Sequence, residues 1–200
     1  MKDLGIIVTN DLKPARQRVK ATARAMSVTG MIGRHFKNLD DEDFLLIHKS
    51  YIRPHVEYCI KAWSPHGVKY IQCLENVLRR ATKLVTGLKK ESCESRLQHL
   101  GLTTLEQRRK RGDMIEVNKI MTGKESIDGQ QFFEKVSNVH NLRGHTMKLY
   151  KGRPRLDIRK CFFSNRVVND WNSLPQMVID AESVNAFKTR IDRYWKDAGD

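Results

Sequence analysis

The sequence contains few cysteines, and they are far apart. Cys59, Cys73, Cys93 and Cys161 are separated by 14, 20 and 68 positions, so the chain has no C-x-x-C pair. Structural zinc sites usually take two ligands from one tight turn, which this spacing does not supply. We therefore expect buried, reduced thiols. The seven histidines form no H-E-x-x-H motif, so the sequence predicts no metal site and no cofactor.

Long apolar runs are also missing. The apolar stretch near the start, residues 4–8, is far shorter than the roughly 20 residues that a membrane-spanning helix needs. No stretch typical of a secretory signal follows the first residues, and the chain has no Asn-x-Ser/Thr glycosylation acceptor. We expect an intracellular protein with no membrane partner.

Acidic residues are scarce relative to basic ones. The chain has 37 Lys and Arg against 23 Asp and Glu, a formal net charge of +14. The excess falls in residues 1–40, 66–112 and 140–170, with net charges of +5, +7 and +6. Such blocks suit a polyanion, because each neutralised phosphate releases condensed counterions. The alternative is a solvated surface that only keeps the protein soluble, and an excess this large favours nucleic acid.

Hydrophobic periodicity predicts a mainly α-helical protein with one or two short strands. The strand candidates are residues 4–8 and 147–150. Helices are predicted over residues 15–37, 44–63 with a kink or end at Pro54, 71–85, 97–100, 104–121, 162–174 and 184–195. Thr103 or Thr104 is the predicted N-cap of the helix over residues 104–121. Ser183 is the predicted N-cap of the helix over residues 184–195. Two loosely coupled helical lobes are expected.

Residues 40–43, with the sequence DDED, allow two interpretations. Paired aspartates can hold catalytic metal ions, but this needs a tight turn between strands that aims both carboxylates at the metal. Here the acids precede an apolar helical run, where carboxylates satisfy free N–H groups and the helix dipole. The position favours helix capping by Asp40 and its neighbours.

The clearest amphipathic helix covers residues 71–85. Its apolar residues recur at i, i+3, i+4, i+7, i+10 and i+11, which forms one buried stripe. Arg79, Arg80 and Lys83 lie largely off that stripe and should face solvent. A helix of this kind can lie along a phosphate backbone.

A run of four basic residues marks the next long helix. Arg108, Arg109, Lys110 and Arg111 cover all sides of a helix, so at least some of them should reach solvent. They could contact phosphate or act as an import signal, which leaves a nuclear location open. Three more arginines flank the strand candidate at residues 147–150 and are further candidates for nucleic-acid binding. These are Arg143, Arg153 and Arg155.

Several segments, taken in order, resemble the end of a LINE-type, non-LTR, jockey-like retrotransposon reverse transcriptase. They are LGI at 4–6, SYIRPHVEY at 50–58 with AWSP at 62–65, LENVLRRATK at 74–83, LGLTTLEQRR at 100–109, RGH at 143–145 and FFSNRVVNDWNSLP at 162–175. The resemblance covers about residues 2–197.

The resemblance implies a three-part organisation. Residues 1–13 would be the last palm strand and turn, residues 14–100 a thumb-like helical region, and residues 101–200 a basic helical C-terminal region. In this family the thumb packs against the template–primer duplex. The implied partner is therefore RNA, DNA or an RNA–DNA hybrid, bound without sequence preference.

The sequence also departs from the family pattern. The metal-binding Asp-Asp hairpin of the polymerase and the endonuclease residues have no counterpart here. We therefore expect no enzymatic activity, but a non-catalytic fragment derived from an RNA-directed DNA polymerase that still binds nucleic acid. Two alternatives stay open: a helical interaction protein that docks an acidic partner, and an unselected transposon remnant with no function.

Overall fold

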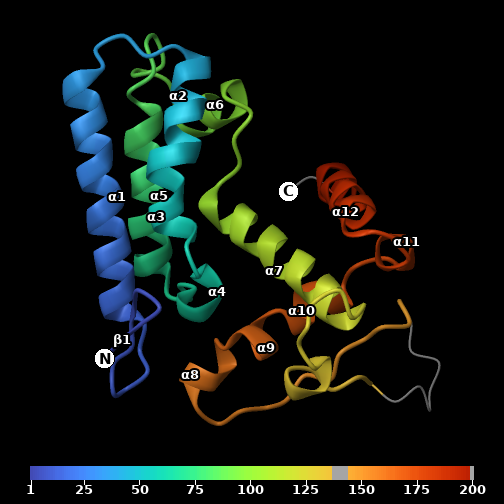
Figure 1. The fold of residues 1–200 in the computed structure, drawn as a ribbon. Helices are drawn as coiled ribbons and strands as arrows, with labels where there is room; N and C mark the ends of the chain where they lie inside the picture. The colour runs from blue at the N-terminus through green and yellow to red at the C-terminus, as the bar shows by residue number, and fades with distance from the viewer. Residues whose placement is uncertain (137–143, 199–200) are drawn as a thin grey trace. The chain divides into compact units, whose positions relative to one another are not determined.

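The computed structural model describes residues 1–136 and 144–198. The protein is mainly helical with one two-stranded sheet, which confirms the predicted fold class (Figure 1). The chain forms two compact units, Met1–Arg109 (unit 1) and Lys110–Asp200 (unit 2). The division lies within one helix, nine residues after the boundary proposed at residues 100 and 101.

Unit 1 begins with a hairpin. Strands β1 (Lys2–Asp3) and β2 (Ile6–Ile7) pair antiparallel, and Leu4 and Gly5 form the turn with φ angles of 42° and 83°. The strand predicted over residues 4–8 is thus shortened to Ile6 and Ile7, because residues 4 and 5 form the turn, and Lys2 and Asp3 supply its partner strand. Gly5 allows the left-handed backbone that lets the chain fold back onto its own start.

Helices make up the rest of unit 1. They are α1 (Ala15–His35), α2 (Asp41–Ile47), the π-helix η1 (His48–Ile52), α3 (Arg53–Glu57), α4 (Ile60–Trp63), α5 (Val68–Thr82) and α6 (Cys93–His99). Helices α1, α3 and α5 lie side by side (Figure 1). The core of unit 1 includes Ala25, Phe44, Leu74 and Ala81, each with no exposed surface.

The interruption expected at Pro54 takes the form of the π-helix η1. Proline lacks an N–H group and its ring clashes with the carbonyl group four residues earlier. The wider π turn removes this conflict, since the amide of Arg53 bonds to the carbonyl group of His48, five residues back. Pro54 then occupies the first turn of α3, where its missing N–H costs nothing.

Helix α7 (Leu105–Met121) crosses the division between the units. Unit 2 continues with η2 (Gly129–Gln131), α8 (Asp157–Lys160), α9 (Phe163–Arg166), α10 (Val168–Asn172), α11 (Gln176–Ile179) and α12 (Val184–Ala198). The helix predicted over residues 162–174 is thus two short helices. The strand predicted over residues 147–150 is reduced to one bridge between Lys135 and Leu149.

The core of unit 2 is separate from that of unit 1. Its fully buried side chains include Met114, Val117, Trp171 and Phe187. The rings of Trp171 and Phe187 stack with centroids 6.1 Å apart. Ser183 caps α12, as predicted, by accepting a hydrogen bond from the amide of Ala186.

The cysteines are less buried than the sequence suggested. All four are free, but Cys59 and Cys73 are exposed and Cys93 and Cys161 are half-buried, so the expectation of buried thiols was wrong. Cys59 has a φ of 48° between α3 and α4, and Cys73 lies on the outer face of α5.

Candidate nucleic-acid interface

The three cations predicted to lie off the apolar stripe are exposed at the end of α5. Arg79 and Arg80 lie in its last turn and Lys83 is its C-cap residue. Their side chains form no hydrogen bond or ion pair with the part of the chain that the structure describes. Cations near a helix C-terminus also interact favourably with the helix dipole. This interaction stabilises the helix and leaves the side chains available for a ligand.

Two further lysines extend this group of cations. Lys89 and Lys90 are exposed in the turns that follow α5. No sequence pattern marks these two lysines, because they belong to no periodic element. We call Arg79, Arg80, Lys83, Lys89 and Lys90 the α5-end surface.

A buried arginine holds this region together. Arg96 of α6 is 1% exposed, and its guanidinium group donates to the hydroxyl group of Thr82 at 2.9 Å and to the carbonyl group of Arg79 at 3.3 Å. It also donates to the carbonyl group of Glu91 at 2.5 Å. One side chain thus bonds to a carbonyl group and a hydroxyl group at the end of α5 and ties the segment of Lys90 and Glu91 to that end. Nothing in the sequence separates Arg96 from the exposed arginines.

Within residues 79–96 the basic residues outnumber the acidic ones. Residues 79–96 contain six Lys and Arg against two glutamates, Glu91 and Glu94, which are both exposed. The pKa of Glu94 is lowered by hydrogen bonds from its own amide and from Ser92, and further by the charges of Arg79 and Arg96. The segment itself therefore carries a net positive charge, and the acids at residues 40–43 begin beside it, since the amide of Thr86 donates to the carbonyl group of Leu39 at 2.9 Å.

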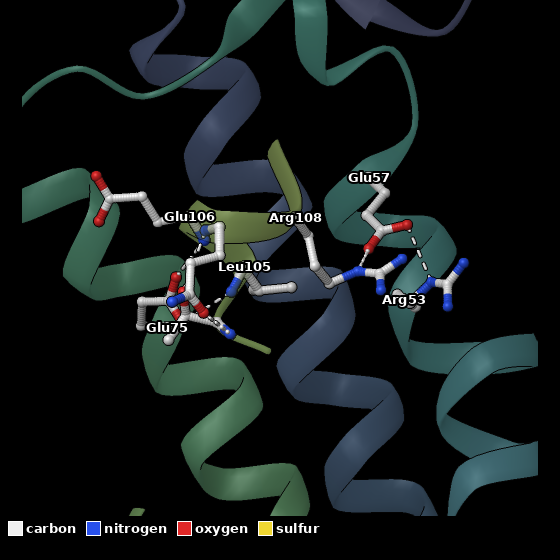
Figure 2. A network of polar contacts seen from close by, with 8 residues as sticks. Arg53, Glu57, Glu75, Leu105, Glu106 and Arg108 are labelled. Carbon is white, nitrogen blue, oxygen red and sulfur yellow. Dashed lines mark hydrogen bonds and ion pairs between the residues drawn. The ribbon is translucent and has the colours of Figure 1, made fainter. Parts of the chain in front are cut away.

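The first two residues of the basic run in α7, Arg108 and Arg109, belong to unit 1, and neither side chain is exposed. Arg108 donates from Nε to Oε1 of Glu57 at 2.7 Å, while Oε2 of Glu57 accepts from Arg53 at 3.0 Å (Figure 2). Arg109 is buried, with 9% of its surface exposed. Arg108 therefore contacts α3, and neither arginine presents a free charge on the outside.

The second half of the run belongs to unit 2. Lys110 is exposed. Arg111 donates from Nε and from Nη2 to the two oxygens of Asp192 at 2.6 and 2.8 Å, and this pairing raises the pKa of Arg111. Lys110 is thus the residue of the run that best fits the expectation of a solvent-facing cation.

The start of α7 is held against α5. The amides of Leu105 and Glu106 donate to the two oxygens of Glu75 at 3.2 and 2.8 Å (Figure 2). Thr104 and Gln107 add a reciprocal pair of bonds, each side chain accepting from the amide of the other residue at 3.1 Å. Thr104 is therefore the N-cap that the sequence left open between residues 103 and 104.

The remaining candidate arginines lie in or near unit 2. Arg143 lies outside the described residues. Arg153 and Arg155 are exposed in the segment before α8, with Lys151 and Arg159 also exposed nearby in sequence. This segment forms a second basic surface, which belongs to unit 2 alone.

The acids at residues 40–43 cap a helix, as predicted. Asp40 accepts a hydrogen bond from the amide of Asp43 at 2.8 Å at the start of α2. Asp41 contacts Nε2 of His99 at 2.8 Å. Within residues 1–136 and 144–198, no group of three or more His, Cys, Asp or Glu side chains is placed to hold a metal ion.

Comparison of the chain with models of protein families, with curated proteins and with solved structures finds no match. In the described part of the chain, no helix combines the length and the apolar character needed to cross a membrane.

Proposed function

We propose that this protein binds the sugar-phosphate backbone of nucleic acid without sequence preference, through the α5-end surface of unit 1. The observation that carries the proposal is the contrast between two sets of arginines. Arg79, Arg80 and Lys83 have exposed side chains without ion-pair partners among the described residues, whereas Arg108 and Arg111 are paired with carboxylates.

The chemistry of this surface suits phosphate groups. Phosphate contacts position a protein on nucleic acid but carry no sequence information, and guanidinium and ammonium groups supply most of them. The net charge of +14 adds a long-range attraction to polyanions. The resemblance to a retrotransposon thumb region supports the same partner class, a duplex or an RNA–DNA hybrid.

The proposal assigns no catalytic step to these 200 residues. Phosphoryl transfer by a polymerase uses carboxylate-held metal ions, whereas Asp40 and Asp41 form a helix cap and a contact with His99. In a primer-extension assay with Mg²⁺ we expect no product. A signal that scales with the protein and disappears in the double variant D40A/D41A would contradict this part of the proposal.

An origin in a retrotransposon reverse transcriptase is part of the proposal. The genomic sequence beside this reading frame should then encode polymerase motifs upstream. Flanking sequence without any such motif would argue against this origin but would leave the binding proposal intact.

Salt dependence of binding tests the α5-end surface. Fluorescence anisotropy with a labelled RNA–DNA hybrid and a matched DNA duplex, between 50 and 300 mM KCl, should give a log–log slope near −0.9 for each phosphate contacted. The variant R79A/R80A/K83A should flatten that slope by roughly two to three units.

A charge-matched control separates local contacts from net charge. The variant K49A/R193A/K196A also removes three exposed cations, at positions outside the α5-end surface, and should change the slope by less than one unit. Equal affinity and equal slope for the wild type and the R79A/R80A/K83A variant would overturn the proposal. Tighter binding to poly-glutamate than to nucleic acid would favour an acidic protein partner instead.

A further inference from the structure

A groove in unit 1 lies between α1 and α3, next to the hairpin turn. It encloses about 590 Å³, a volume within the range of ligand sites. Lys20 and Arg24 line it from α1, and His55 and Tyr58 line it from α3 and its end. The α5-end surface contributes nothing to this groove.

The groove lies along the first half of α1, whereas the α5-end surface follows the second half of α5. Arg18 of α1 packs over the ring of Tyr70 at the start of α5, with 4.4 Å between its Cζ and the ring centroid. Gly33, fifteen residues later, approaches Leu84, just after α5. The lining of the groove includes no residue of α5, so a ligand in the groove would use contacts separate from those of Arg79.

Helix α1 brings positive charge to the groove and no negative charge. Its 21 residues contain five Lys and Arg and no Asp or Glu. Arg16, Lys20 and Arg24 follow one another at four-residue intervals, so they lie along one side of the helix about 6 Å apart in rise. All three are exposed and have no ion pair with the described residues, although Nζ of Lys20 lies 3.4 Å from the carbonyl oxygen of Gly5.

The acid of the groove is already neutralised. Glu57 is the one acidic residue in the lining, and each of its carboxylate oxygens accepts a hydrogen bond from a different arginine, Arg53 or Arg108 (Figure 2). Two guanidinium groups therefore outweigh one carboxylate at this point. Burial lowers the pKa of His55, and the charge of Arg24 lowers it further, as expected beside an uncompensated cation.

Tyr58 offers an aromatic ring held in place at the same groove. Its hydroxyl group donates to the carbonyl group of Leu4 at 2.8 Å, while 54% of the residue stays exposed. The hairpin turn lies against the ring, since a Cβ atom at Gly5 would be 3.8 Å from Cε1 of Tyr58. A fixed, exposed ring beside a row of cations is the combination that single-stranded nucleic acid recognises, because its bases are free to stack.

We propose that this groove binds single-stranded nucleic acid, with phosphates along Arg16, Lys20 and Arg24 and a base stacked on Tyr58. The inference rests on the proposed function and adds to it a second subsite with a strand preference. The bases of a duplex are stacked on one another and do not reach Tyr58. The bases of a single strand can stack on the ring while its phosphates contact the cations. The shared ligand chemistry is a nucleotide phosphate, which a free mononucleotide also carries.

Binding of a labelled 12-residue oligo(dT) to the full chain tests this subsite. The variant K20A/R24A should flatten the log–log salt slope for oligo(dT) by roughly 1.4 units, since each phosphate contact on a single strand contributes about 0.7. The same variant should leave the slope for a DNA duplex within about half a unit of the wild type.

Two tyrosine variants separate stacking from a structural role. Tyr58→Leu removes the ring and should weaken oligo(dT) binding about fivefold or more. Tyr58→Phe removes only the hydroxyl group, and with it the bond to Leu4, and should keep the affinity within about twofold of the wild type. Equal losses in both variants would assign Tyr58 to the hairpin rather than to the ligand.

The outcomes distinguish this inference from the proposed function. If K20A/R24A binds oligo(dT) with unchanged affinity and slope while R79A/R80A/K83A loses duplex binding, the groove is not a subsite but the α5-end surface stands. If the groove variants lose oligo(dT) and R79A/R80A/K83A changes nothing, the proposed surface falls. If the wild-type protein binds neither probe, both the proposed function and the groove subsite are overturned. If dTMP binds saturably and as tightly as oligo(dT), the ligand of the groove is a mononucleotide rather than a single strand.

Discussion

Arg108 and Glu57 are 51 positions apart in the sequence and form a 2.7 Å charged hydrogen bond that joins the start of α7 to α3. Both side chains are about 30% exposed, and Arg53 bonds to the other oxygen of the same carboxylate. A partly shielded arginine that is already paired contributes to the fold of unit 1 and has little charge left for a ligand.

This pairing predicts opposite results for two arginines. Arg108→Ala should lower the free energy of unfolding of unit 1 by about 1 kcal/mol, because it leaves Glu57 with one partner. It should change duplex affinity by less than about twofold. Arg79→Ala should do the reverse, weakening duplex binding with almost no effect on stability. Urea unfolding and anisotropy on the same samples check both, and a larger binding loss for Arg108→Ala would contradict the assignment.

Arg96 is expected to be the most sensitive to substitution among the arginines that the structure describes. Arg96→Met keeps an unbranched apolar stem but leaves two carbonyl groups and the hydroxyl group of Thr82 without their donor. The cost should be about 2–4 kcal/mol. Hydrogen exchange of residues 79–92 should speed up in this variant. Arg80→Met, an exposed neighbour, is the control and should cost under about 0.5 kcal/mol.

His48 should make unit 1 sensitive to acid. Its side chain is 2% exposed and stacks on Phe44, and no partner of its Nδ1 is found among the described residues. Burial lowers its pKa from 6.5 to about 4, with a further contribution from the charge of Arg53. Between these two values the unfolded chain binds a proton that the folded chain does not, so stability falls as the pH falls from 6.5 to 4.

The variant His48→Phe tests this sensitivity. It removes the titrating group and keeps an aromatic ring, so its stability relative to the wild type should rise as the pH is lowered from 7 to 4. The full gain is up to about 3 kcal/mol. His55 and His145 have pKa values lowered by burial too, but they are present in both proteins and cancel. A stability difference that stays constant with pH would contradict the prediction.

Glu75 should act as an N-cap supplied by another helix. Glu75→Leu removes both acceptors of the amides of Leu105 and Glu106, and should cost about 1 kcal/mol. Exchange of those two amides should accelerate most. Glu106→Gln removes a carboxylate from the same turn of α7 without touching these bonds, so it should leave the two amides protected.

The sequence carried enough information to determine the helical fold class and much of the secondary structure. The apolar stripe of α5, the cap at Asp40 and the cap at Ser183 depend on residues within a few positions of each other. The interactions involved, i to i+3 and i to i+4 contacts and bonds to the first free amides, are local. The exposure of Arg79, Arg80 and Lys83 follows from the same local geometry.

The tertiary structure determines which charged side chains remain available to bind a ligand. Arg96 and Arg79 are both helical arginines within one basic block, yet one is fully buried and the other exposed. The partners of Arg108, Arg111 and Glu75 are 51, 81 and 30 positions away. The groove beside Lys20 also exists only because α3 and the hairpin turn meet α1 there. Charge–charge contacts act over a few ångströms of space irrespective of sequence separation, so a local pattern cannot show that Arg108 or Arg111 meets a distant carboxylate.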